Sequence, residues 1–190
     1  DWTDISPDLP EWSTITAIDV SRHSPGTAYI SGERHRVSDR TPYLYKTTDY
    51  GQSWQLITNG IREYDYSWVI REDPVRPGLL YAGTETGVYV SFDDDASWQS
   101  LQRNLPPIEV MNMVVKEDDL VASTHSRGFW ILDNLSALRQ ITPEVAAASV
   151  HLFRPAPLMR NLGQRLGPAV ETTTEGMNPP NGLTVDYYLA

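Results

Sequence analysis

Acidic side chains that could form a catalytic pair occur in three short stretches, at Glu33, at Glu63 and Asp65, and at Glu85. Hydrolysis of a glycosidic bond needs two carboxylates about 5 to 9.5 Å apart, one of which acts as an acid. The four residues could supply such a pair if the fold brings their stretches together. A glycan-hydrolysing site is therefore one interpretation of these residues.

The same stretches are rich in arginine, histidine and tyrosine, and arginine and tyrosine are favoured at the centres of protein interfaces. The segment GERHRVSDRTP (32–42) is clearly longer than its counterparts at 84–87 and 124–128. Long loops on a rigid scaffold are where binding residues concentrate. A protein-docking surface is the second interpretation, and a solvated rim without a ligand is the third. The candidate binding residues are Glu33, Arg34, His35, Arg40, Arg62, Glu85, His125 and Arg127.

Several other kinds of chemistry are not indicated. Arg34, Arg40 and Arg127 do not stand at equivalent places in the repeats, as the arginine triad of a sialidase would. The four histidines have no metal-ligand spacing, and we expect no metal site. No phosphate loop, Ser-His-Asp order or nucleotide-binding motif is present, so we expect no cofactor. The chain has no cysteine, which excludes disulfides and thiol chemistry.

Charge and hydropathy limit the partners. The chain has 25 acidic and 15 basic residues and a net charge of −10, which argues against a nucleic-acid partner. No apolar run approaches the roughly 18 to 20 residues of a membrane span, so we expect no direct span.

An octapeptide pattern occurs twice, as TTDYGQSW (47–54) and SFDDDASW (91–98). In a tight turn an Asp carboxylate can accept hydrogen bonds from following backbone N–H groups. Glycine supplies a backbone angle that other residues resist, and Asp95 stands where the first copy has Gly51. We predict a structural role for the residues of this pattern, and an acidic turn rather than a Ca²⁺ site at 93–95. These residues are Thr47, Asp49, Gly51, Trp54, Ser91, Asp93 and Trp98.

Short runs rich in β-branched and aromatic residues recur around these turns, for example TAYISG (27–32), LLYAGT (79–84) and DLVAST (119–124). Four such strands per unit, at a spacing of about 40 to 50 residues, are typical of propeller blades. We therefore predict an all-β fold: a partial β-propeller over 1–142, with about three four-stranded blades, an extended linker and a terminal strand. The blades are expected at about 12–58, 66–102 and 108–142, after the tail of an earlier blade; the third has a degraded turn. A Pro/Gly-rich linker is expected at 143–182 and the first strand of a following β-domain at 183–190.

The full turn pattern resembles the Asp-box (BNR) repeat of sialidase-like and sortilin-like propellers. PYLYKTTDYGQSW and REDPVRPGLLYAGTETGVYVSFDDDASWQSLQRNLP look like the exported bacterial sortilin-like, glycosyl-hydrolase-type proteins. The resemblance covers nearly the whole chain and implies a propeller, with the Asp boxes between the third and outer strands. It also implies an exported or periplasmic location.

Three blades do not close a propeller, and open blade faces invite association. We therefore expect a non-catalytic interaction or structural module, a subunit or fragment of a larger assembly. Its expected partners are other subunits or missing blades, with a glycan as a further candidate. The alternative is part of a carbohydrate-active propeller enzyme. The chain alone is expected to be oligomeric or poorly soluble.

Overall fold

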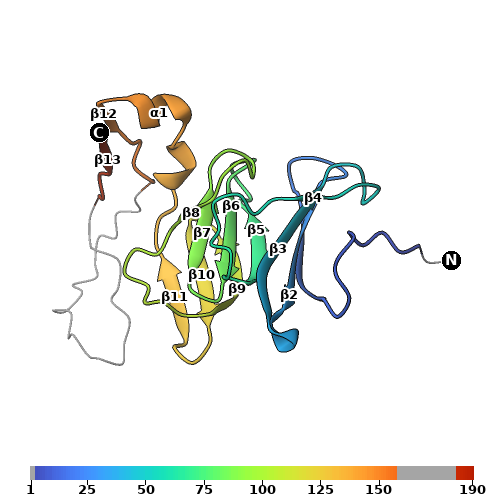
Figure 1. The fold of residues 1–190 in the computed structure, drawn as a ribbon. Coiled ribbons are helices and arrows are strands. Elements are labelled where there is room, and N and C mark those ends of the chain that lie inside the picture. The colour runs from blue at the N-terminus through green and yellow to red at the C-terminus, as the bar shows by residue number, and fades with distance from the viewer. Residues whose placement is uncertain (1–2, 158–182) are drawn as a thin grey trace. The chain divides into compact units, whose positions relative to one another are not determined.

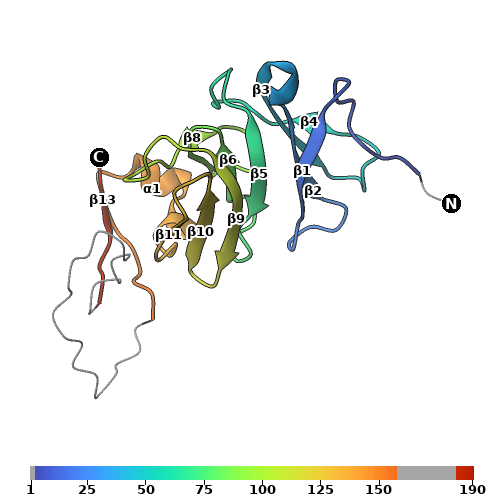
Figure 2. The same ribbon diagram turned by 90° about the horizontal axis from the view of Figure 1, so that it is seen from below.

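The computed structural model describes residues 3–157 and 183–190, in two compact units, 1–132 and 133–190. The first unit consists of three antiparallel sheets, drawn in blue, green and yellow in Figures 1 and 2. The first sheet has the order β1-β2-β3-β4, the second β5-β6-β7-β8 and the third β11-β10-β9. The fold is therefore all-β and a partial β-propeller, which confirms the predicted fold class.

Each sheet is a meander in which consecutive strands are neighbours. The strands of the first sheet are β1 Thr14–Val20, β2 Ala28–Arg34, β3 Asp39–Thr47 and β4 Gln55–Leu56, with a 3₁₀ turn η1 at His35–Val37. Those of the second sheet are β5 Ser67–Glu72, β6 Leu80–Thr84, β7 Val88–Ser91 and β8 Gln99–Ser100. Those of the third are β9 Val110–Lys116, β10 Asp119–Thr124 and β11 Phe129–Leu132.

The sheets pack face to face through their first strands, because β5 contacts β1 and β2 on one side and β9 on the other. Side chains alternate between the two faces of a strand, so the second sheet has one face toward the first sheet and one toward the third. Tyr29 and Leu44 of the first sheet share a buried core with Ile70, Leu80 and Tyr89 of the second. This inter-sheet core holds the first two blades together.

The third sheet has three strands, where the repeat predicts a fourth after its turn. The turn residues explain the difference. Leu132 has no hydroxyl at the position of Thr47, and Arg139 stands where the repeat predicts a tryptophan. The 3₁₀ turn η2, Leu138–Gln140, lies where the fourth strand is expected.

The second unit contains a short helix α1, Pro143–Ala147, and the strands β12, Val150–Leu152, and β13, Tyr187–Leu189. The helix falls in the stretch expected to be a linker. It begins where Thr142 Oγ1 accepts a hydrogen bond from Val145 N at 3.3 Å and Pro143 fills the first position. β13 pairs antiparallel with β12, from Val150 opposite Leu189 to Leu152 opposite Tyr187. Residues 158–182 of the expected linker lie outside the described residues.

Candidate binding site at the loop rim

The loops between second and third strands lie at the opposite end of the sheets from the two octapeptide turns. In the first sheet, η1 marks the β2–β3 loop, at the end of the ribbon away from the β3–β4 turn (Figure 1). We use the name loop rim for the segments 32–42, 61–66, 84–87, 105–109 and 124–128. All eight predicted binding residues belong to this rim.

Hydrogen bonds join the rim loops of the first two sheets. Arg40 forms an ion pair with Glu85 across the two sheets. The backbone N–H of Glu85 donates to Tyr66 O at 3.0 Å. Asp65, which is 1% exposed, accepts from Thr86 N at 3.0 Å and from Thr86 Oγ1 at 2.6 Å. The loops are therefore tied to one another.

The carboxylate of Glu109 connects the second and third sheets. It accepts hydrogen bonds from Tyr66 Oη at 2.6 Å and Trp68 Nε1 at 2.7 Å, and it pairs with His125 Nδ1 at 2.8 Å. Burial alone would raise the pKa of Glu109, but the bonds from Tyr66, His125 and Trp68 outweigh it and lower this pKa. Glu109 is therefore an ionised anchor for three aromatic side chains.

A second carboxylate, Glu33, is 2% exposed and lies beside His35. Its Oε2 accepts from the backbone N–H of His35 at 2.9 Å and contacts Nδ1 of the same residue. The His35 ring stacks on Tyr66 with centroids 5.0 Å apart and planes at 18°, and it lies 5.5 Å from the Trp68 ring. These aromatic rings and carboxylates thus form one cluster beneath the rim. Its members are Glu33, His35, Tyr66, Trp68, Glu109 and His125.

The predicted binding residues differ in how far this cluster includes them. Glu33, His35 and His125 belong to it, and Arg40 and Glu85 form the adjoining ion pair. Arg34 pairs with Asp39 beside the cluster. Arg62 and Arg127 are exposed in the same set of loops.

Tyr66, Trp68 and Glu109 belong to the cluster but were not among the predicted site residues. Tyr66 and Trp68 flank the start of β5, where an aromatic residue such as Trp68 is also a common strand residue. Glu109 lies two residues after Pro107 in a crossover between blades. Its position in a crossover is the sequence feature that could have indicated a site residue, because crossovers reach the same end of the sheets as the rim loops.

The carboxylates considered for glycan hydrolysis are mostly engaged within the protein. Glu33 and Asp65 are buried and hydrogen-bonded, and Glu85 pairs with Arg40. Glu63 is exposed in the β4–β5 crossover. The geometry favours these acids as supports for the rim loops rather than as a catalytic pair facing a cleft.

At the opposite end, the two octapeptide turns have the same hydrogen bonds. Asp49 Oδ1 accepts from Ser53 N at 2.9 Å, as Asp93 Oδ1 accepts from Ser97 N at 3.0 Å. Thr47 Oγ1 accepts from the backbone N–H of Gly51 at 2.9 Å. In the second copy Ser91 Oγ accepts from Asp95 N at 3.1 Å, and Asp95 has φ +77°, close to the +83° of Gly51. Asp95 therefore adopts the backbone conformation that Gly51 has in the first copy, and the two turns share one hydrogen-bond pattern.

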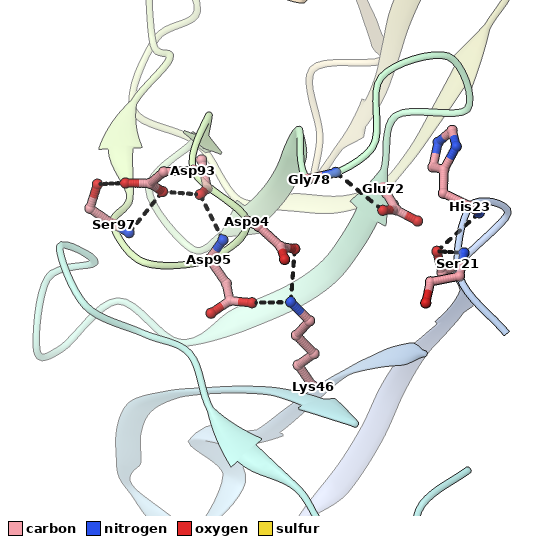
Figure 3. Close-up of polar contacts among 11 residues, drawn as sticks. Ser21, His23, Lys46, Glu72, Gly78, Asp93, Asp94, Asp95 and Ser97 are labelled. Carbon is pink, nitrogen blue, oxygen red and sulfur yellow. Dashed lines mark hydrogen bonds and ion pairs between the residues drawn. The ribbon is translucent and has the colours of Figure 1, made fainter. Parts of the chain in front are cut away.

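Lys46 engages the two further aspartates of the second turn, as Figure 3 shows. Its Nζ donates to Asp94 Oδ1 at 2.8 Å and to Asp95 Oδ2 at 2.7 Å. Burial would lower the pKa of Lys46, but the bonds to both aspartates raise it above its usual range. One ammonium group from the preceding sheet thus offsets part of the negative charge of the acidic run.

The tryptophan of each turn reaches back to the preceding repeat. Trp98 Nε1 donates to Ile57 O at 2.6 Å, and Trp54 Nε1 donates to Ile5 O at 2.7 Å. Ile57 follows β4 of the first sheet by one residue, so Ile5 holds the equivalent place on the other side of that sheet. At Gly60, which has φ +99°, an added Cβ would lie 2.2 Å from Trp98 O, so the crossover needs glycine there.

Within residues 3–157 and 183–190, no group of three or more His, Asp or Glu side chains is placed to hold a metal ion. No helix in that described part of the chain has the length and apolar character to cross a membrane.

Comparison with solved structures gives β-propeller neighbours at low sequence identity. The chain matches the GH74 xyloglucanase from Xanthomonas campestris with a TM-score of 0.53, at 17% identity over 70% of this chain and 22% of that one. A GH74 enzyme from Niastella koreensis matches with a TM-score of 0.49 at 10% identity, covering 63% and 21% of the two chains. YCF48 bound to D1 peptide matches with a TM-score of 0.46 at 21% identity, covering 64% and 37%.

The chain thus spans well under half the length of each of these three proteins, and the xyloglucanase likeness supports the propeller fold alone. No family model and no curated protein sequence matches the chain.

Proposed function

We propose that this chain is a non-catalytic structural and protein-interaction module, a group of Asp-box propeller blades that packs on further blades in a larger assembly. The Asp-box identity is supported by the matched hydrogen bonds of the two turns. The exported or periplasmic location rests on the resemblance to sortilin-like exported proteins.

The observation that carries this proposal is an apolar face on the first sheet. Register pairs Ile18 with Ile30 in the first sheet and Ile70 with Ala82 in the second, so Ile18 and Ile70 are equivalent. Ile70 is 0% exposed in the core between the sheets, whereas Ile18 is 64% exposed. The two equivalent side chains thus differ in exposure. Ile70 packs against the first sheet, whereas the face that carries Ile18 has no neighbouring sheet among the described residues.

The exposed face is hollowed and apolar. A cavity of about 390 Å³ lies on it, lined by Ile15, Ile18, Val20 and Ile30 together with Ile5 and Trp54. Exposed apolar patches of this kind mark interaction surfaces. The Trp54–Ile5 bond repeats the Trp98–Ile57 bond, and Ile57 directly follows a preceding sheet. A further blade is therefore the occupant that fits.

The engaged carboxylates of the rim support the non-catalytic part of the proposal. A glycoside hydrolase needs two carboxyl groups free to face the substrate, and Glu33, Asp65 and Glu109 spend theirs on internal hydrogen bonds. The fold likeness to a xyloglucanase is the observation behind the carbohydrate-active alternative, and of the four carboxylates considered for it Glu63 alone is exposed.

Thiol labelling tests the proposal directly, because the chain has no cysteine of its own. Ile18→Cys in the native assembly is expected to react with a thiol reagent at least about tenfold more slowly than in the chain alone, since the face is covered. Val75→Cys is the matched control, an exposed residue (63%) in the β5–β6 turn that should react equally fast in both. Equal labelling of Ile18→Cys in the two preparations would refute the proposal.

A further inference from the structure

We infer that the blade covering the first sheet is the third sheet of a second copy of this chain, and that residues 3–5 of each copy complete the third sheet of the other. This inference rests on the proposed function, in which a further blade covers the first sheet, and it names that blade. Three observations carry it: an exposed apolar face on the third sheet, a strand missing from that sheet, and a segment before the first sheet that matches the missing strand.

The outer face of the third sheet, on the side away from β5 in Figure 2, is apolar and exposed. The strand registers make Leu44 of β3, Val88 of β7 and Phe129 of β11 equivalent. Leu44 and Val88 are 0% and 4% exposed, because the next sheet packs over each of them, whereas Phe129 is 78% exposed. Ile131 and Val114 are exposed as well, at 57% and 53%. This face therefore lacks the neighbour that the first two sheets have on the same side.

The two open faces are the two halves of one contact between blades. Tyr29 and Leu44 of the first sheet share a buried core with Ile70 and Trp98 of the second repeat. The equivalents of Ile70 and Trp98 line the cavity on the first sheet; they are Ile18 and Trp54. The equivalents of Tyr29 and Leu44 lie on the outer face of the third sheet; they are Val121 and Phe129. One chain thus carries both halves of the contact, and each half is open.

The third sheet also lacks its fourth strand. In the other two sheets a short fourth strand pairs with the third one, with Gln55 opposite Lys46 and Gln99 opposite Val90. Within the part of the chain that the structure describes, β11 pairs with β10 alone. The register makes Ile131 of β11 the equivalent of Lys46 and Val90. A fourth strand would therefore pair with β11 at this residue.

Residues 3–5 belong to a segment that matches a fourth strand. The sequence WTDI (2–5) corresponds to WQLI (54–57), which contains β4. Ile5 O accepts a hydrogen bond from Trp54 Nε1, as Ile57 O accepts one from Trp98 Nε1. This bond holds Ile5 at the place where the fourth strand of a preceding sheet ends. In a head-to-tail pair the preceding sheet is the third sheet of the other copy, and this is the strand that it lacks.

Two copies account for both open faces at once. Each copy contributes three sheets, so a pair contains six, within the range of about four to eight blades in propellers. Three sheets are fewer than the smallest propellers contain, so we do not expect one chain to close on itself. Contacts between unlike faces form a ring when their rotation closes. We therefore expect a dimer in which each copy gives residues 3–5 to the other.

Disulfide trapping tests the strand exchange, because the chain has no cysteine of its own. Thr3 is expected opposite Ile131, as Gln55 lies opposite Lys46, and directly opposite residues on paired strands are within disulfide distance. Mixed Thr3→Cys and Ile131→Cys chains should form a covalent heterodimer, identified by its mass, at least about tenfold faster than Val75→Cys and Ile131→Cys chains. Val75 is a matched control because it is exposed (63%) in the β5–β6 turn.

Sedimentation of mixed variants tests the head-to-tail direction. Ile18→Asp places a carboxylate on the first-sheet face and Phe129→Asp places one on the third-sheet face, so each variant alone should shift toward monomer. Each keeps the face that the other has lost, so their mixture should associate about tenfold more tightly than either variant alone. A mixture of Phe129→Asp with Ile131→Asp is the control; both changes lie on the third-sheet face, and no association should return.

A heterodimer that forms no faster than the Val75→Cys control would overturn the inference. So would a Phe129→Asp chain that associates like the parent, because like faces would then be in contact. Circular dichroism verifies the fold of Phe129→Asp, and the trapping experiment does not depend on that variant. Protection of Ile18→Cys in the native assembly without disulfide trapping would show that a blade of another origin covers the face. The proposed function would then stand while this inference fails.

Discussion

In each octapeptide turn, one aspartate carboxylate accepts a hydrogen bond from a backbone N–H group of the turn. Bonds from Ser53 and Thr47 lower the pKa of Asp49 to about 2. Burial would raise the pKa of Asp93, but bonds from Ser97 and Ser91 lower it overall. Both turns are therefore fastened by ionised aspartates, and their strength depends on pH.

Asp49 contributes stability that acid removes. Its pKa in the folded chain is about 2, below the ordinary value of about 3.9. The contribution is therefore complete above about pH 4 and is lost as the pH falls toward 2. We expect Asp49→Asn to lower the melting temperature at pH 7 by roughly 2–4 °C and to flatten its decline between pH 4 and 2.

Calorimetry across this pH range measures the effect. Glu63→Gln removes an exposed carboxylate and should leave the curve of the parent chain unchanged. An Asp49→Asn chain whose melting temperature falls with acid as steeply as the parent's would contradict the assignment.

At the scale of elements, neighbouring sheets are joined by polar links as well as by the apolar core. Lys46 lies on β3, and its side chain is 11% exposed. Asp95, which is 9% exposed, lies on the β7–β8 turn of the next sheet. The link is sheltered enough that removing one partner leaves a poorly solvated charge.

Lys46→Met is expected to destabilise the first unit by about 3 kcal/mol, the lower end of the range for breaking a buried ion pair. Adding Asp95→Gly should restore much of this loss. It removes the stranded carboxylate, and glycine accepts the positive φ of that position. Denaturant unfolding of the single and double variants measures both steps; a double variant as unstable as Lys46→Met would refute the link.

At the scale of the whole molecule, apolar side chains remain exposed on the first sheet. Ile15, Ile18 and Val20 of β1 are 40%, 64% and 68% exposed. Each would bury apolar surface against a further blade, at about 25 cal/mol per Å² removed from water. We therefore expect the chain to associate through this face.

Analytical ultracentrifugation of the chain alone is expected to show concentration-dependent association. Ile18→Asp should shift the distribution toward monomer, because a carboxylate in the interface would have to be desolvated. Val75→Asp, an equally exposed site away from the face, should not. A parent chain that sediments as a clean monomer at all concentrations would be evidence against this tendency.

The repeat, the strands and the turn chemistry could be predicted from the sequence, because they depend on local patterns. Thr47, Asp49 and Gly51 lie close together in sequence, so their hydrogen bonds follow from spacing alone. Leu132 and Arg139 mark the turn of the third unit as degraded, but the repeat still predicts a fourth strand there, and the structure has three strands in this sheet. The short helix α1 was missed because five residues give too little periodicity, although Thr142 and Pro143 mark its start.

The rim cluster depended on the tertiary structure, because its members come from segments far apart in the chain. Glu33, Tyr66 and Glu109 converge only when three sheets stack with their loops at one end. Packing also determines which charged side chains are exposed to solvent. Glu33 is buried beside His35, while Arg62 and Arg127 are exposed. Sequence patterns determine residue types and turns, whereas which side chains are buried together depends on packing between sheets.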